Sequence, residues 1–186
     1  FYFRCCIGKK GRTNQKKEGD LKTPKGIFKI GSLFYRADRE KKPETKIRCI
    51  KIKKDIVCYN DIKKKQYYNQ ISKKNKKIRH ETLFRKDHKY DFILPIKYNF
   101  KNIPGKGSCI FMHLTRDYNH TAGCIALERK NFLILLKLIN SKTKIEIMFQ
   151  LFILNRSSFL RCLKKRCKIL ISNLFPTSNI KYFYSF

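Results

Sequence analysis

Cys124 and His113 are the residues of this sequence whose types and spacing best fit a chemical role. A thiolate is a strong nucleophile, and an imidazole close to it lowers the thiol pKa or accepts the thiol proton. Gly123 lets the backbone approach a substrate closely, and the N–H groups of Gly123 and Cys124 can face a developing oxyanion. On spacing alone such a pair is more typical of packing residues, so the segments around it must decide between the two interpretations.

Strands are expected before and around this pair. Residues 27–30 and 47–53 alternate apolar with polar side chains, which is typical of half-buried strands. Residues 108–114 are an apolar run of the length of a buried strand. Residues 92–98 form another such run, and Pro95 within it suggests the edge of a sheet, because proline has no N–H to donate.

One helix is expected directly after the cysteine, in residues 128–139. Its apolar side chains recur at helical spacing: Phe132, Leu135, Leu136 and Ile139. Another strand is expected at residues 145–149, so strands dominate and we predict a mostly-β fold. Residues 151–186 differ in composition and form a basic C-terminal extension, for which an amphipathic cationic helix and a poorly ordered or packing segment both remain open.

Three motifs surround or precede the cysteine turn. Residues 105–114 read GKGSCIFMHL, and residues 121–127 read TAGCIAL. Upstream, residues 17–28 read KEGDLKTPKGIF. Together they resemble the L,D-transpeptidase (YkuD-type) catalytic domain, in the branch with a Gly-Ser-x-Ile-Phe-x-His strand and a Thr-x-Gly-Cys turn. The resemblance extends over roughly residues 5–149.

The resemblance implies a β-sandwich of the L,D-transpeptidase type in residues 1–150, with one main helix after the cysteine turn. It implies a cysteine acyltransferase that acts on the stem peptides of peptidoglycan. In that chemistry Cys124 attacks the carbonyl before a terminal D-Ala of a tetrapeptide stem, and the D-Ala leaves. An amine of a second stem then resolves the thioester into a cross-link, whereas water as acceptor would give an L,D-carboxypeptidase.

The implied roles fall on a small set of residues. His113 is the base that activates Cys124, and Gly123 and Thr121 support the oxyanion. No metal and no cofactor is implied. The family's action on the cell wall implies the periplasm or cell envelope, and we expect a monomer whose partners are stem peptides, with peripheral contact to an anionic membrane or wall.

The sequence departs from the better-known branch of the family at the turn. That branch commonly has Ser/Thr-His-Gly-Cys followed by Asn or Arg, whereas Ala122 and Ala126 stand near those positions here. The roles of the missing polar side chains must pass to backbone N–H groups or to other residues. Candidates for substrate binding lie in the loop between His113 and Cys124, where a cation could hold a stem carboxylate: Arg116, Tyr118 and His120.

The chain carries a formal net charge of +32 over 186 residues. Such a charge attracts polyanions, and Tyr67, Tyr68 and Tyr98 among lysines would suit a nucleic-acid-binding protein, which is the alternative function. No recognised DNA- or RNA-reading motif is present, so we do not expect nucleic acid as the partner. Residue types that are encoded by A/T-rich codons make up 95 of the 186 residues, so codon bias explains the lysine content as well as a surface that binds a polyanion does.

Three further features bound the class of protein. The longest stretch without a charged residue is Ile169 to Ile180, 12 residues, which is too short for a membrane-spanning helix. The chain opens without Met or a leader pattern, so we expect that no signal segment is included. The eight cysteines show no CxxC spacing, which disfavours a zinc ribbon; Cys109 is expected to be a core side chain or to form a disulfide.

Overall fold

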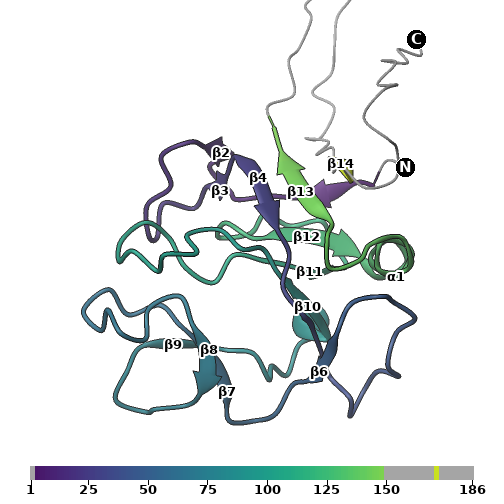
Figure 1. Cartoon of the computed structure of the whole chain (residues 1–186), viewed down its shortest axis with the longest axis horizontal. Coiled ribbons are helices and arrows are strands. Elements are labelled where there is room, and N and C mark those ends of the chain that lie inside the picture. The colour runs from purple at the N-terminus through teal and green to yellow at the C-terminus, as the bar shows by residue number, and fades with distance from the viewer. Residues whose placement is uncertain (1–2, 149–169, 172–186) are drawn as a thin grey trace, which may run out of the picture.

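A computed structural model of the chain describes residues 3–148 and the strand Leu170–Ile171. Strands provide most of the regular structure in this part of the chain, and its α-helix, α1 (Arg129–Leu138), follows the cysteine turn (Figure 1). The predicted mostly-β class and the main helix are confirmed. The basic extension at residues 151–186 lies outside the described residues, apart from Leu170 and Ile171, so the predictions made for it stay predictions.

The central sheet has six strands in the order β1, β12, β11, β10, β5 and β6. Their bounds are Cys5–Cys6 (β1), Ile125–Glu128 (β12), Phe111–Thr115 (β11), Phe92–Pro95 (β10), Leu33–Tyr35 (β5) and Cys49–Lys51 (β6). β11 runs parallel to β12 and β5 runs parallel to β6, whereas the other neighbours are antiparallel. The strand with the predicted base and the strand after the predicted nucleophile are therefore adjacent.

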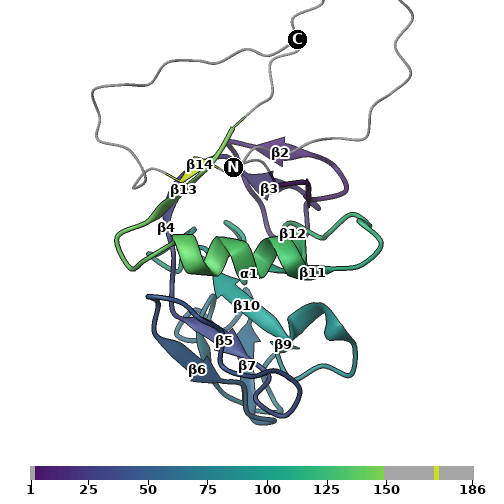
Figure 2. The same cartoon turned by 90° about the vertical axis from the view of Figure 1, so that its right-hand side faces the viewer.

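Smaller sheets flank the central one. They are β14 (Leu170–Ile171) with β13 (Lys144–Ile147) and β4 (Gly26–Lys29); β8 (Ile71–Lys73) with β7 (Ile56–Tyr59) and β9 (His80–Thr82); and β2 (Arg12–Thr13) with β3 (Thr23–Pro24). A short 3₁₀ turn, η1 (His88–Tyr90), leads into β10. In both views β4 and β13 lie on one side of the central strands, and β7 to β9 lie on the other (Figures 1 and 2).

Side-chain alternation gives the paired strands β11 and β12 two different faces. Met112 and Leu114 point into the main core, together with Ile125 and Leu127 of β12. Helix α1 packs against these strands and adds its buried side chains to that core, as its position along the strands in Figure 2 shows. The residues at the intervening positions must therefore project from the opposite face, because successive side chains of a strand alternate.

One expectation from the sequence is wrong. Pro95 does not mark an edge strand, because β10 lies between β5 and β11 inside the sheet. The proline is the last residue of β10 and lies beyond the residues of this strand that pair with β5, where only the isolated bridge between Ile30 and Ile96 continues the pairing. Its carbonyl still accepts a hydrogen bond of 2.8 Å from the Gly31 N–H.

Candidate active site

Cys124 and His113 come together because β11 and β12 are parallel and in a fixed register. His113 pairs with Ala126, and Met112 pairs with Ile125. Cys124 precedes β12 and is two residues before Ala126, so it shares the face of Ala126 and His113. Cys124 packs beside Phe111 in a second apolar cluster on this face. The register thus brings together the two residues that the sequence singled out.

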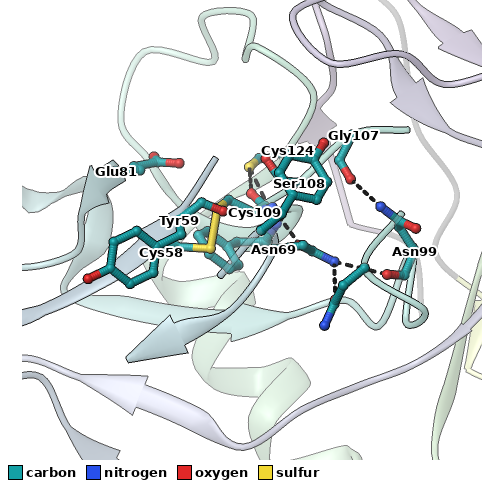
Figure 3. The surroundings of a disulfide bond; sticks show 12 residues. Cys58, Tyr59, Asn69, Glu81, Asn99, Gly107, Ser108, Cys109 and Cys124 are labelled. Carbon is teal, nitrogen blue, oxygen red and sulfur yellow. Dashed lines mark hydrogen bonds between the residues drawn. A yellow bond between two sulfur atoms is a disulfide. The ribbon is translucent and has the colours of Figure 1, made fainter. Parts of the chain in front are cut away.

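The Cys124 sulfur lies between two backbone groups. The Phe111 N–H donates to Sγ at 3.3 Å, and the thiol donates to the Cys109 carbonyl at 3.4 Å (Figure 3). Burial and, to a smaller extent, the negative charge of Glu81 raise the pKa of the thiol to about 12, while the Phe111 N–H and Lys16 act in the opposite direction. The cysteine is therefore a thiol in the free protein, with an N–H already in place for the thiolate.

His113 is 7% exposed and its ring is oriented by the backbone. The nitrogen Nδ1 lies 2.9 Å from the Leu114 carbonyl, and because a carbonyl only accepts, Nδ1 carries the proton. The other nitrogen, Nε2, is then the basic one. Burial lowers the pKa of His113 to about 4, with the nearby Arg85 and Lys89 acting in the same direction and the Leu114 carbonyl against them.

No hydrogen bond joins His113 to Cys124 in the described part of the chain. With a thiol pKa of about 12 and an imidazole pKa of about 4, the pair rests in its neutral form. Proton transfer therefore requires a substrate or a small movement that brings Nε2 to the sulfur, as is common for catalytic pairs in the absence of a ligand.

The turn before Cys124 is held by Thr121 and requires glycine. The Thr121 hydroxyl donates to the Cys124 carbonyl at 2.6 Å and accepts from the Gly123 N–H at 3.2 Å. Gly123 has φ +155, and a Cβ there would lie 3.0 Å from the Lys22 carbonyl oxygen. Since the Gly123 N–H is engaged, the Cys124 N–H, which has no partner among the described residues, is the backbone donor available to an oxyanion.

A disulfide supports the backbone next to the Cys124 thiol. Cys109, whose carbonyl accepts from the Cys124 thiol, is joined to Cys58 of β7 (Figure 3). The Cys109 N–H donates to the side-chain oxygen of Asn69 at 2.9 Å, and the amide nitrogen of Asn69 donates to the carbonyls of Tyr98 and Asn99. Cys109 has φ +52, so covalent and hydrogen-bonded supports hold an unfavourable backbone conformation in place.

The site opens into a cleft of about 880 Å³. Cys124, His113, Gly123 and Thr121 line it. Of the three residues predicted for substrate binding, Arg116 and His120 also line it, and both are exposed. Tyr118 lies elsewhere: its hydroxyl donates to Glu128 at 3.0 Å, and the Arg4 guanidinium is 4.0 Å from its ring centre. Tyr118 thus anchors the loop rather than facing the cleft.

Sequence reasoning gave no role to several residues that shape the site. Glu81 and Tyr90 are two of them, and nothing in the local sequence assigns a function to either. Cys58 and Asn69 are far from Cys109 in sequence. The signal available for the disulfide was a second cysteine, Cys58, that also lies in an apolar segment. Among the described residues, no group of three or more His, Cys, Asp or Glu side chains could hold a metal ion.

Residues 1–147 match the YkuD family, the L,D-transpeptidase catalytic domain. The chain therefore belongs to this family of cysteine acyltransferases. The comparison with curated proteins and the comparison with solved structures gave no match. Helices in the described residues are too short or too polar to cross a membrane.

Proposed function

We propose that this protein is a peptidoglycan L,D-transpeptidase that uses Cys124 as its nucleophile and His113 as its general base. The observation that carries the proposal is the position of the Cys124 thiol in an open cleft, on the same sheet face as His113 and within hydrogen-bond distance of the Phe111 N–H. Family membership supplies the reaction class, and this geometry supplies the residues for it.

In the first half-reaction Nε2 of His113 takes the thiol proton while the sulfur attacks the carbonyl before the terminal D-Ala of a tetrapeptide stem. The Cys124 N–H faces the oxyanion, and Thr121 and Gly123 hold the turn that presents it. The C–N bond to D-Ala breaks, and the nitrogen of D-Ala receives the proton from His113. A thioester on Cys124 remains.

In the second half-reaction an amine of another stem attacks the thioester, and the sulfur leaves and recovers a proton. If water attacks instead, the same site acts as an L,D-carboxypeptidase. The acylation step has the same requirements in both cases, so the nature of the acceptor decides the product.

Arg116 and His120 are the proposed contacts for the anionic groups of the stem. Both line the cleft, and Arg116 has no ion pair with an acidic side chain in the described part of the structure. A guanidinium without a protein counter-ion can bind a carboxylate in two-point geometry. An action on stem peptides places the protein in the periplasm or cell envelope, where we propose that it works as a monomer.

The test is muropeptide analysis after the protein is incubated with peptidoglycan rich in tetrapeptide stems. New L,D-linked dimers and released D-Ala are expected from the natural chain, and Cys124→Ala should yield neither. A carbapenem should add one acyl group to the natural chain and none to that variant, as intact mass would show. Unchanged muropeptides together with the absence of a carbapenem adduct would overturn the proposal.

A further inference from the structure

Glu81 is a charged residue of the cleft that the reaction above does not use. It lies on β9, comes from the small sheet that covers the nucleophile's face, and lines the cleft together with Cys124 and His113. Figure 3 shows its carboxylate on the side that faces Cys124. Its negative charge raises the pKa of Cys124, because both side chains line the same cleft.

The Glu81 carboxylate is oriented by Tyr90, whose hydroxyl donates to Oε1. The Tyr90 ring in turn packs edge-on against His113, with ring centres 5.2 Å apart, and against Phe111 at 6.2 Å. Tyr90 is 5% exposed, so its position is fixed by packing. One buried tyrosine therefore sets the relative positions of the carboxylate and the proposed base.

No cation neutralises this carboxylate. Within the described residues, no nitrogen of a lysine, arginine or histidine lies within 4.0 Å of Glu81, although the chain has 45 lysines and arginines. Burial raises the pKa of Glu81, and the nearby Arg85 lowers it only in part, because its guanidinium forms a two-point contact with Asp87. Glu18, a second carboxylate of the cleft, is likewise held by hydroxyls, those of Tyr68 and Ser108.

We propose that Glu81 is a specificity-determining residue that binds the cationic amine of the acceptor stem beside the Cys124 thioester. The inference rests on the proposed function, which requires an amine acceptor. Such an amine arrives mostly as an alkylammonium ion, and a half-buried carboxylate without a counter-ion is the group that binds one most favourably. Its partner on the other side, Tyr90, would keep the carboxylate in place while the ammonium enters.

The chemistry balances without any further reagent. The ammonium loses one proton to Nε2 of His113, and the resulting amine attacks the thioester carbonyl. The new C–N bond forms, the C–S bond breaks, and the nitrogen loses a second proton. One of the two protons returns to the Cys124 sulfur and the other is released to solvent, so that His113 ends neutral. Glu81 gains and loses nothing: it positions the nitrogen and favours a charged acceptor over water.

The test compares two acceptors on the full chain, using a tetrapeptide stem as donor. Nα-acetyl-lysine amide carries an ammonium group, and hydroxylamine is neutral at pH 7. In Glu81→Gln, which keeps the shape and the acceptor oxygen for Tyr90, we expect the KM of the lysine acceptor to rise about 10- to 100-fold relative to that of hydroxylamine. The ratio of transfer to hydrolysis should fall with it.

A control and a second variant keep the outcomes distinct. Glu146→Gln makes the same change on β13, outside the cleft, and should leave both acceptors unaffected. Tyr90→Phe keeps the ring against His113 and removes only the hydroxyl, so a smaller rise of the same KM is expected. Equal changes for both acceptors in Glu81→Gln would overturn the role of Glu81 while leaving the transpeptidase proposal intact. Absence of Cys124 acylation in the natural chain would instead remove the proposed function.

Discussion

At the scale of single residues, the site holds the proposed nucleophile and the proposed base in their uncharged forms. Cys124 is half-buried in the cleft and lies near the negative Glu81, and both effects disfavour a thiolate. His113 is deprived of water and lies near Arg85 and Lys89, which disfavours an imidazolium. The two effects act in the same direction, so a thiolate and imidazolium pair forms only as the reaction begins.

The first prediction concerns the reactivity of this thiol. Because the pKa of Cys124 is raised to about 12, alkylation by iodoacetamide should be slow at pH 8 and should rise about tenfold per pH unit up to about pH 10. Peptide mass spectrometry of Cys124 would give the rate, with the same peptide in the unfolded chain as reference. A rate that levels off near pH 7 would instead indicate a preformed ion pair with His113.

The second prediction concerns acid stability. His113 has a pKa of about 4 in the folded protein, below the value of about 6.5 in an unfolded chain, so the unfolded state binds the proton first as the pH falls. Above pH 6.5 His113 is neutral in both states and does not affect the free energy of unfolding. As the pH falls from 6.5 to 4, protonation of His113 in the unfolded state lowers the free energy of unfolding by about 3 kcal/mol. Urea unfolding at both pH values would measure it.

His113→Gln supplies the comparison for that measurement, because glutamine does not titrate. Between pH 6.5 and pH 4, the free energy of unfolding should fall by about 3 kcal/mol less in this variant than in the natural chain. Carboxylates titrate equally in both proteins and cancel in the difference. An identical pH dependence in the two proteins would mean that His113 keeps its ordinary pKa in the fold.

At the scale of elements, the disulfide and the Asn69 side chain hold the segment that leads into β11. This segment supplies both backbone groups that contact the Cys124 sulfur, namely the Cys109 carbonyl and the Phe111 N–H. Its position depends on β7 through Cys58, so the small sheet and the central sheet together position the backbone groups that contact the Cys124 sulfur. Loosening this link should affect stability and acylation together.

The third prediction is that Cys58→Ala combined with Cys109→Ala lowers the free energy of unfolding by about 2 to 4 kcal/mol, because the bond closes a loop across a sequence separation of 51. Carbapenem acylation of Cys124 should slow as the Phe111 N–H loses its fixed position. Cys49→Ala, at a half-buried free cysteine, is the matched control and should cost about 1 kcal/mol or less. An unchanged acylation rate in the double variant would separate the disulfide from catalysis.

At the scale of the whole molecule, the charge of +32 surrounds a cleft whose cations are mostly paired. Lys16, Arg39, Arg85 and Arg129 all line the cleft, and each makes an ion pair with an acidic neighbour. The excess charge therefore lies largely outside the reacting centre. It suits long-range attraction to an anionic wall or membrane better than recognition of one stem peptide.

The fourth prediction is that binding to isolated sacculi weakens as salt rises from about 50 to 500 mM, because salt screens charges that are exposed to solvent. Sedimentation of Cys124→Ala with sacculi would measure the binding without turnover. Binding that does not respond to salt would leave codon bias as the explanation of the lysine content.

Much of the fold and the centre of the site could be predicted from the sequence. The apolar periodicity of residues 128–139 predicted α1, and the alternating run around Ile50 predicted β6. That Cys124 and His113 lie close together followed from the two motifs that contain them, because each motif is a short segment of characteristic residue types. The edge position of Pro95 was wrong, because the order of strands is set by long-range pairing that a local pattern does not contain.

The sequence by itself determined the family, the mostly-β class and the candidate pair Cys124 and His113, because motifs and periodicity are properties of neighbouring residues. Only the tertiary structure decided that Cys58 joins Cys109, that Tyr118 turns from the cleft to Glu128, and that Glu81 faces Cys124 without a cation. Each of these depends on strands distant in the chain that pack against one another. Burial and electrostatic partners, and hence the pKa values of the site, exist only once that packing is complete.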